Sequence, residues 1–202
     1  MTEGTTSSPL RPRSLGRAES SVTPIDDARG VGVVVRLVAY LLDALIVALG
    51  IYVVVLLLHA LIGPTVRIAE VDGVPRLSVD RLRSLIDTAV ATALAGTYFV
   101  GSWLAWGGTP AQRLVRARVE RADGGGRLGL GSAIKRWLLL GAPFGLLSTL
   151  LLPIPALGAF LAVVIGFWHL ALLVTTARDR RKRGLHDRLA GSIVLRRRDA
   201  TA

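Results

Sequence analysis

The sequence predicts an all-α integral membrane protein, a bundle of about four transmembrane helices. Apolar residues make up 51% of the 202-residue chain. They gather in four blocks that hold few charges, at residues 37–62, 85–106, 137–152 and 156–176. A spanning helix needs about 20 mostly apolar residues, and each block approaches or meets that length. The 25 Lys and Arg side chains, against 14 Asp and Glu, lie mainly between and beyond the blocks, as in the loops of a membrane protein.

The chain divides into a membrane domain and two polar ends. Residues 1–30 are rich in Ser, Thr, Pro and Arg and contain no apolar run that could serve as the core of a signal peptide. This composition predicts a disordered cytoplasmic tail. Residues 31–195 form the membrane domain, and residues 196–202 form a basic C-terminal end.

The first apolar block, residues 31–62, is almost uninterrupted Val, Leu, Ile and Ala. It ends at Gly63-Pro64, a pair that stops a helix. The next stretch, residues 65–84, mixes charged side chains with Gly73 and Pro75. We expect a short loop outside the membrane there, with a small hairpin.

The second block carries Asp87 near its start, and Trp103 and Trp106 near its end are expected at the headgroup level. Residues 107–110, Gly-Gly-Thr-Pro, terminate it. Apolar and polar residues then alternate over 115–119 before a glycine-rich turn at 123–126. This pattern predicts a small cytoplasmic hairpin at the membrane surface, with an amphipathic helix as the alternative.

The apolar stretch from residue 134 to 176 is too long for one span and too apolar to leave the membrane for long. Pro153 and Pro155 divide it. We therefore expect two helices joined by a very short turn, with Pro143 kinking the first of them.

The distribution of Lys and Arg predicts the topology, because cytoplasmic loops hold the excess. With four spans and both termini inside, five of these residues precede Leu37, seven lie in 107–136 and nine follow Thr176. Only four lie in the outside loop. We expect a multi-pass protein of the cell membrane with both termini cytoplasmic.

Several function classes are disfavoured by the residues present. The basic residues lie at the ends of apolar blocks and form no stripe on a soluble domain, so we expect no nucleic-acid partner. There is no cysteine, no metal-ligand spacing, no phosphate-binding loop and no nucleophile constellation, so neither an enzyme nor a cofactor is expected. The bilayer itself is the expected partner, with anionic lipid headgroups at residues 178–183, where five of six side chains are basic. A homo-oligomer or a membrane-protein partner remains open.

Asp43 is the most informative single residue because it lies inside an apolar run. An ionisable group at membrane depth costs roughly 2.5 to 3.5 kcal/mol, so it needs compensation. It is either a proton or cation site or a polar contact that locks helices together. Arg36 lies seven residues earlier, on the same helix face about 10 Å away, too far for a direct pair. Arg36 either anchors the helix at the headgroups or faces an acidic group such as Asp187.

Other polar and small residues are weaker candidates. His59 and His169 lie within apolar blocks, and His186 adjoins Asp187 outside them. A lone histidine is more often a packing residue than a functional one. Arg113 follows the second block and is a secondary candidate, with His169 and His186. Small residues at Gly96 and Gly101 are expected to allow close helix packing.

Three stretches resemble the RDD family of membrane proteins. They are Arg36-Leu-Val-Ala-Tyr-Leu-Leu-Asp43, Gly108-Thr-Pro-Ala-Gln-Arg-Leu114 with Arg118-Val119, and Leu185-His-Asp-Arg-Leu-Ala-Gly-Ser192. The resemblance covers residues 31–195 and implies that Arg36, Asp43 and Asp187 are the arginine and two aspartates of the family name. The chain departs from the family at Ala111-Gln112, where Gly-Lys is usual, and at Ser192, where Thr is usual.

Two functional hypotheses follow. In the first, the protein is transport-related: Asp43 binds a proton or cation, and Arg36 and Asp187 form a cytoplasmic-side polar network with it. In the second, the protein is a non-catalytic scaffold or accessory subunit, and the three residues only hold helices and basic loops in register.

Overall fold

The computed structural model describes residues 30–124, 126–151 and 154–196. Residues 1–29 of the predicted tail (1–30), residues 197–202 of the predicted C-terminal end (196–202), and residues 125, 152 and 153 lie outside the described residues. Within these described ranges, three helices are long and apolar enough to cross a membrane: α1 (Val33–Ile62), α2 (Arg81–Trp106) and α6 (Pro155–Arg178). A bent pair, α4 (Leu130–Leu139) and α5 (Ala142–Leu151), makes a fourth candidate span. The remaining elements are α3 (Pro110–Leu114), α7 (Leu185–Leu189) and four short strands.

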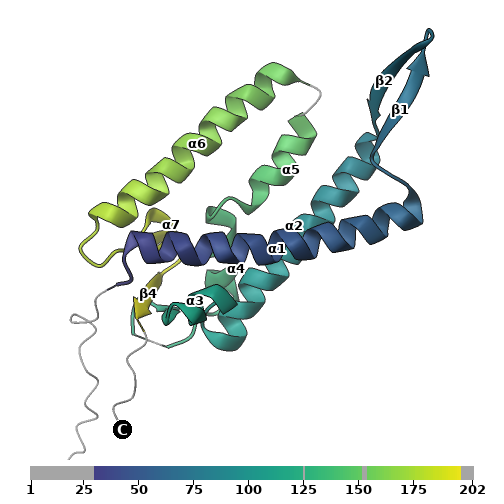
Figure 1. Ribbon diagram of the computed structural model, residues 1–202. Helices are drawn as coiled ribbons and strands as arrows, with labels where there is room; N and C mark the ends of the chain where they lie inside the picture. Colours follow the sequence, from purple (N-terminus) through teal and green to yellow (C-terminus); the bar gives the residue numbers. More distant parts are fainter. Residues whose placement is uncertain (1–29, 125, 152–153, 197–202) are drawn as a thin grey trace, which may run out of the picture.

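The prediction of a membrane-type helical bundle is confirmed, but the all-α class is correct only in part. Strands β1 (Val66–Val71) and β2 (Val74–Val79) form the hairpin expected in the loop after the first helix. Its tight turn places Asp72 and Gly73 at φ of 56° and 75°, the left-handed conformation that an Asp-Gly hairpin turn requires. The hairpin projects from the end of the bundle where α1 finishes (Figure 1).

The prediction of a local hairpin around residues 115–126 is wrong, and so is the alternative prediction of an amphipathic helix. Strand β3 (Ala117–Arg121) pairs antiparallel with β4 (Ser192–Arg196), which is supplied by the far end of the chain. Alternation explains why: Ala117 and Val119 are buried, and they pack with Val194 against Trp103 in the main apolar core. The local turn forms only a single bridge, between Glu120 and Arg127.

The third span is broken rather than kinked at Pro143. Helix α4 ends at Leu139, Gly141 has φ of 111°, and α5 starts at Ala142 at a bend of 47°. Pro143 therefore lies in the first turn of a new helix, where its missing N–H has no partner to lose. A Cβ at Gly141 would approach Phe144 to 3.1 Å, and the positive φ also favours glycine there.

Two of the strands and the two five-residue helices gather at the end of the bundle opposite the β1–β2 hairpin. There, β3, β4, α3 and α7 surround the start of α1 and the end of α2, and both ends of the described chain emerge (Figure 1). We call this end the termini side. Away from it, α1 exposes large apolar side chains, such as Leu45 and Leu61 at 67% and 82%, as a lipid-facing helix does.

Gly96 allows close packing, as expected, whereas Gly101 does not. A Cβ at Gly96 would lie 2.9 Å from the Trp137 ring, and a Cβ at Gly101 would meet nothing within 4 Å. We expect Gly96→Ala to lower the free energy of unfolding by about 1–3 kcal/mol because the indole must shift. The matched Gly101→Ala should leave it unchanged or raise it by up to about 1 kcal/mol. Unfolding of both variants in mixed micelles checks this, and equal effects would contradict the packing assigned to Gly96.

Candidate functional site

Asp43 is almost fully buried, with 1% of its surface exposed, and both of its carboxylate oxygens accept hydrogen bonds. Oδ1 accepts from the Tyr98 hydroxyl at 2.6 Å and from the Ala111 backbone N–H at 3.2 Å. Oδ2 accepts from the Thr109 hydroxyl at 2.5 Å. These donors come from α2 and from the start of α3. The Asp43 carboxylate therefore connects three elements that are distant in sequence.

Local sequence explains why α3 begins where Asp43 can reach it. Thr109 is the N-cap and Pro110 is the first helical residue, the position at which proline is best tolerated. A capping box closes the turn, because the Gln112 side chain accepts from the Thr109 N–H at 3.0 Å. The same oxygen accepts from the Trp103 indole at 3.2 Å. Gln112, one of the departures from the family pattern, thus has a structural role in this chain.

Asp187 is the centre of a second buried cluster. Its Oδ2 accepts from Arg36 at 2.6 Å and from the Gly184 N–H at 3.1 Å, which caps α7. Its Oδ1 accepts from the Arg136 guanidinium, and Arg136 also donates to the Ser192 hydroxyl at 2.7 Å. The contact expected between Arg36 and Asp187 is present. It joins the first helix to α7, across 151 residues of sequence.

Arg136 is the residue that sequence reasoning missed. It looks like an ordinary basic residue at the start of a span, yet only 3% of it is exposed, and its guanidinium lies 5.2 Å from the Trp103 ring centroid. A cation over an indole in a buried site is stabilised by the ring quadrupole. Nothing in the spacing of the chain distinguishes Arg136 from Lys135, which remains exposed.

Burial and charge set the ionisation of this cluster. Burial would raise the pKa of Asp187, but Arg136 and Arg36 outweigh it and hold that pKa well below its usual range. Burial, helped by both arginines, lowers the pKa of His186 from 6.5 to about 4, against the opposing effect of Asp187. His186 is therefore neutral at pH 7, and the two arginines stabilise the Asp187 carboxylate. The four side chains carry a net charge of +1.

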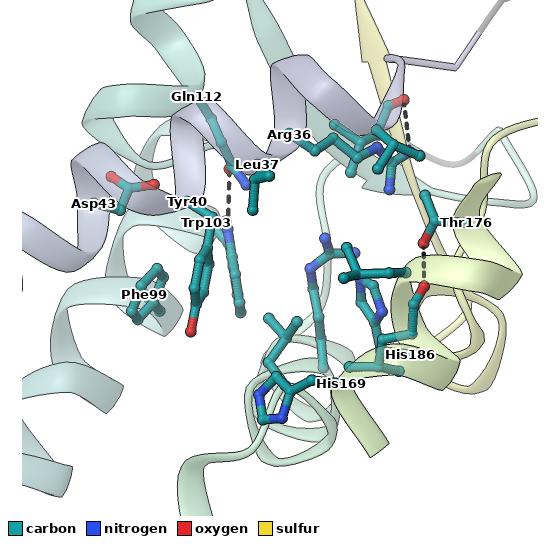
Figure 2. A pocket seen from close by; sticks show the side chains of 16 residues that line it. Arg36, Leu37, Tyr40, Asp43, Phe99, Trp103, Gln112, His169, Thr176 and His186 are labelled. Carbon is teal, nitrogen blue, oxygen red and sulfur yellow. Dashed lines mark hydrogen bonds between the residues drawn. The ribbon is translucent and has the colours of Figure 1, made fainter. Parts of the chain in front are cut away.

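The prediction that Asp43, Arg36 and Asp187 form a single polar network is wrong for the part of the chain that the structure describes. Asp43 and Asp187 have separate sets of partners. What the two clusters share is a cavity of about 200 Å³, which Arg36, Asp43, Arg136 and His186 help to line. Figure 2 shows Asp43 at one end of this cavity and Arg36, Thr176 and His186 toward the other.

The secondary candidates occupy different places. His169 lines the same cavity from α6, and its Nδ1 lies 2.8 Å from the Ile165 carbonyl of its own helix. Arg113 is not among the residues that line this cavity, and its guanidinium lies 5.7 Å from the Trp106 ring centroid. His186 belongs to the Asp187 cluster, with Nε2 3.4 Å from Oδ1. The surface contact taken as the default for His186 is wrong, since 8% of it is exposed.

A third polar cluster lies near the hairpin, at the opposite end of α1 from Arg36. His59 Nε2 is 2.8 Å from Asp87 Oδ2 and 3.1 Å from the Thr65 hydroxyl, and Thr65 donates to the same Asp87 oxygen. The sequence analysis named His59 and Asp87 separately and did not predict that they would pair. Within the described ranges, no group of three or more His, Asp and Glu side chains could hold a metal ion.

Comparison with known proteins adds one match. The family model described as "RDD family" matches residues 31–191, which contain Arg36, Asp43, Arg136 and Asp187. No curated protein and no solved structure matches the chain.

Proposed function

This chain belongs to the RDD family of membrane proteins, and on that premise we propose that it acts as a non-catalytic membrane scaffold or accessory subunit. In this proposal, Asp43 and Asp187 hold the termini side of the helix bundle in one fixed shape, which is presented to partners at the membrane surface. The proposal rests on one observation, which is that the carboxylates of Asp43 and Asp187 are already fully engaged in hydrogen bonds within the chain. Each accepts at both oxygens, and every donor except the Gly184 N–H, which caps the helix of Asp187 itself, comes from another element of the chain.

The Asp43 contacts favour this assignment over a cation site. An ion at Asp43 would need free lone pairs and further oxygen ligands, but three donors already point at the carboxylate. The backbone N–H of Ala111 can only donate, so it would oppose a cation. Displacing these donors would release the start of α3 from α1.

Transport is the second candidate, and one observation favours it. Arg36 and Asp43 line the same cavity within the bundle, and intramembrane ionisable residues at a cavity commonly mark an ion or substrate pathway. Here Asp43 would bind a proton or a monovalent cation as the Thr109 and Tyr98 hydroxyls turn away.

The distribution of basic residues also supports a placement in the membrane. We propose that the termini side is cytoplasmic in the cell membrane, because 21 of the 25 Lys and Arg residues belong to the two ends and the 107–136 segment. The basic run at 178–183 follows α6 and would contact anionic headgroups there. A second copy of this chain, bound through the termini side, would be one such partner.

Flux and unfolding measured together separate the two candidates. For Asp43→Asn, the scaffold proposal predicts a loss of about 1–3 kcal/mol in the free energy of unfolding, because the amide cannot accept at both positions. It also predicts that wild-type proteoliposomes carry no proton or monovalent cation flux under an imposed pH gradient. Thr109→Val should destabilise similarly, whereas Thr97→Val, at an exposed helical threonine, should not. Wild-type flux that is lost in a folded Asp43→Asn would overturn the scaffold proposal in favour of transport.

A further inference from the structure

We propose that the cavity beside α1 and α6 binds one phospholipid with an anionic, hydroxyl-bearing headgroup. Part of one acyl chain would lie against the apolar walls, and the headgroup would lie beside Arg36, Arg136 and His186. This site is additional to the proposed scaffold function and does not depend on it.

The walls of the cavity suit an acyl chain. Val33, Leu37 and Tyr40 line it from α1, and Leu172 and Leu173 line it from α6. Leu37, Tyr40 and Leu173 are 44%, 45% and 44% exposed, so the cavity opens sideways on the apolar surface that faces lipid. An apolar cavity of about 150 Å³ accepts a molecule the size of benzene, so about 200 Å³ accepts a short stretch of acyl chain. The remainder of the lipid would lie among its neighbours in the bilayer.

One end of the cavity is basic and has unused hydrogen-bonding capacity. Arg36 and Arg136 share one carboxylate, Asp187, while His186 is neutral, so this end holds one positive charge in excess. Among the described residues, Arg136 Nε and His186 Nδ1 are buried polar atoms without a hydrogen-bond partner. Both residues line the cavity and are more than nine-tenths buried. Burying an uncompensated charge and unsatisfied polar atoms is costly, and an anion in the cavity would relieve both costs.

The two unpartnered atoms also indicate the chemistry of the headgroup. Arg136 Nε–H can only donate, and it suits a phosphate oxygen. With Nε2 of the neutral His186 directed at Asp187, Nδ1 is left as an acceptor, which suits a hydroxyl. Phosphatidylglycerol presents both groups, whereas phosphatidylcholine presents no hydroxyl and carries a compensating positive charge. Asp43 lies at the other end of the cavity, with its oxygens occupied by Tyr98, Thr109 and Ala111.

Native mass spectrometry of the detergent-purified full chain tests the site. The protein is titrated with phosphatidylglycerol, with phosphatidylcholine and with glycerol phosphate, which is the headgroup without acyl chains. We expect one phosphatidylglycerol per chain at concentrations where phosphatidylcholine does not bind, a preference of about tenfold or more. Leu37→Trp and Leu173→Trp fill the cavity from opposite walls and should each weaken this binding about tenfold.

Matched variants keep the result interpretable. Leu41→Trp and Leu170→Trp place the same bulk on the same helices, at exposed positions that do not line the cavity, and both should bind phosphatidylglycerol as wild type does. Equal retention of the two phospholipids would overturn the proposal. So would unchanged binding in the two cavity-filling variants, or binding of glycerol phosphate alone, which would make this a site for a free anion.

Discussion

Asp187→Ala is expected to lower the free energy of unfolding by about 3–5 kcal/mol, the cost of leaving buried charges without their partner. The loss is large because two guanidiniums, those of Arg36 and Arg136, depend on this one carboxylate. The N–H of Gly184 also loses the acceptor that caps α7. Unfolding in mixed micelles, followed by circular dichroism, measures the change.

Two comparisons make the Asp187 result specific. Asp123→Ala removes a carboxylate from an exposed pair with Arg121 and should cost less than about 1 kcal/mol. Combining Asp187→Ala with Arg136→Met removes one of the stranded charges, so the double variant should be more stable than the sum of the two single losses predicts. A small effect of Asp187→Ala, within the range of Asp123→Ala, would mean that the cluster does not hold the termini side together.

Stability is expected to fall by about 3 kcal/mol between pH 6.5 and pH 4 because of His186. The pKa of this side chain is lowered from 6.5 to about 4 by burial and by the neighbouring arginines. As the pH falls below 6.5, His186 is protonated in the unfolded chain but stays neutral in the folded chain, so the equilibrium shifts toward unfolding. The contribution of His186 is therefore complete above pH 6.5 and is lost progressively toward pH 4.

His186→Gln isolates this contribution from the other groups that titrate over the same range. Glutamine does not ionise, so the variant should show a flatter dependence of the unfolding midpoint on pH than wild type. The two curves should diverge most between pH 4 and 6.5 and run parallel above pH 7. Parallel curves across the whole range would show that His186 is not held neutral by the Asp187 cluster.

The helical part of the fold could be predicted because hydrophobic length is a local property of the sequence. The helices α1, α2 and α6 begin one to four residues before the predicted spans and end no more than two residues beyond them. The charged stretch with Gly73 and Pro75 indicated the β1–β2 hairpin for the same local reason. The partner of β3 could not be found this way, because its strand comes from residues 192–196, and nothing near residue 117 in the sequence indicates that pairing.

Site residues could be predicted where a charged side chain interrupts an apolar run, because the cost of burying that charge is evident from the sequence. Site residues that are buried only by tertiary packing could not be predicted. Asp43 and Arg36 are conspicuous because they interrupt an apolar run, and Arg36 does meet Asp187. Arg136 is not conspicuous, since a basic residue at a span boundary is expected on topological grounds alone. Only the fold shows that it is buried between Asp187 and Trp103.

Hydrogen exchange of the start of α3 tests most directly whether the buried carboxylates hold the termini side together. Exchange at residues 109–115 should be slow in wild type and clearly faster in Asp43→Asn, because the Asp43 carboxylate holds Thr109 and Ala111 against α1. The β1–β2 hairpin, at the other end of the bundle, should exchange at the same rate in both proteins. Unchanged exchange at residues 109–115 in the folded variant would contradict a locking role for Asp43.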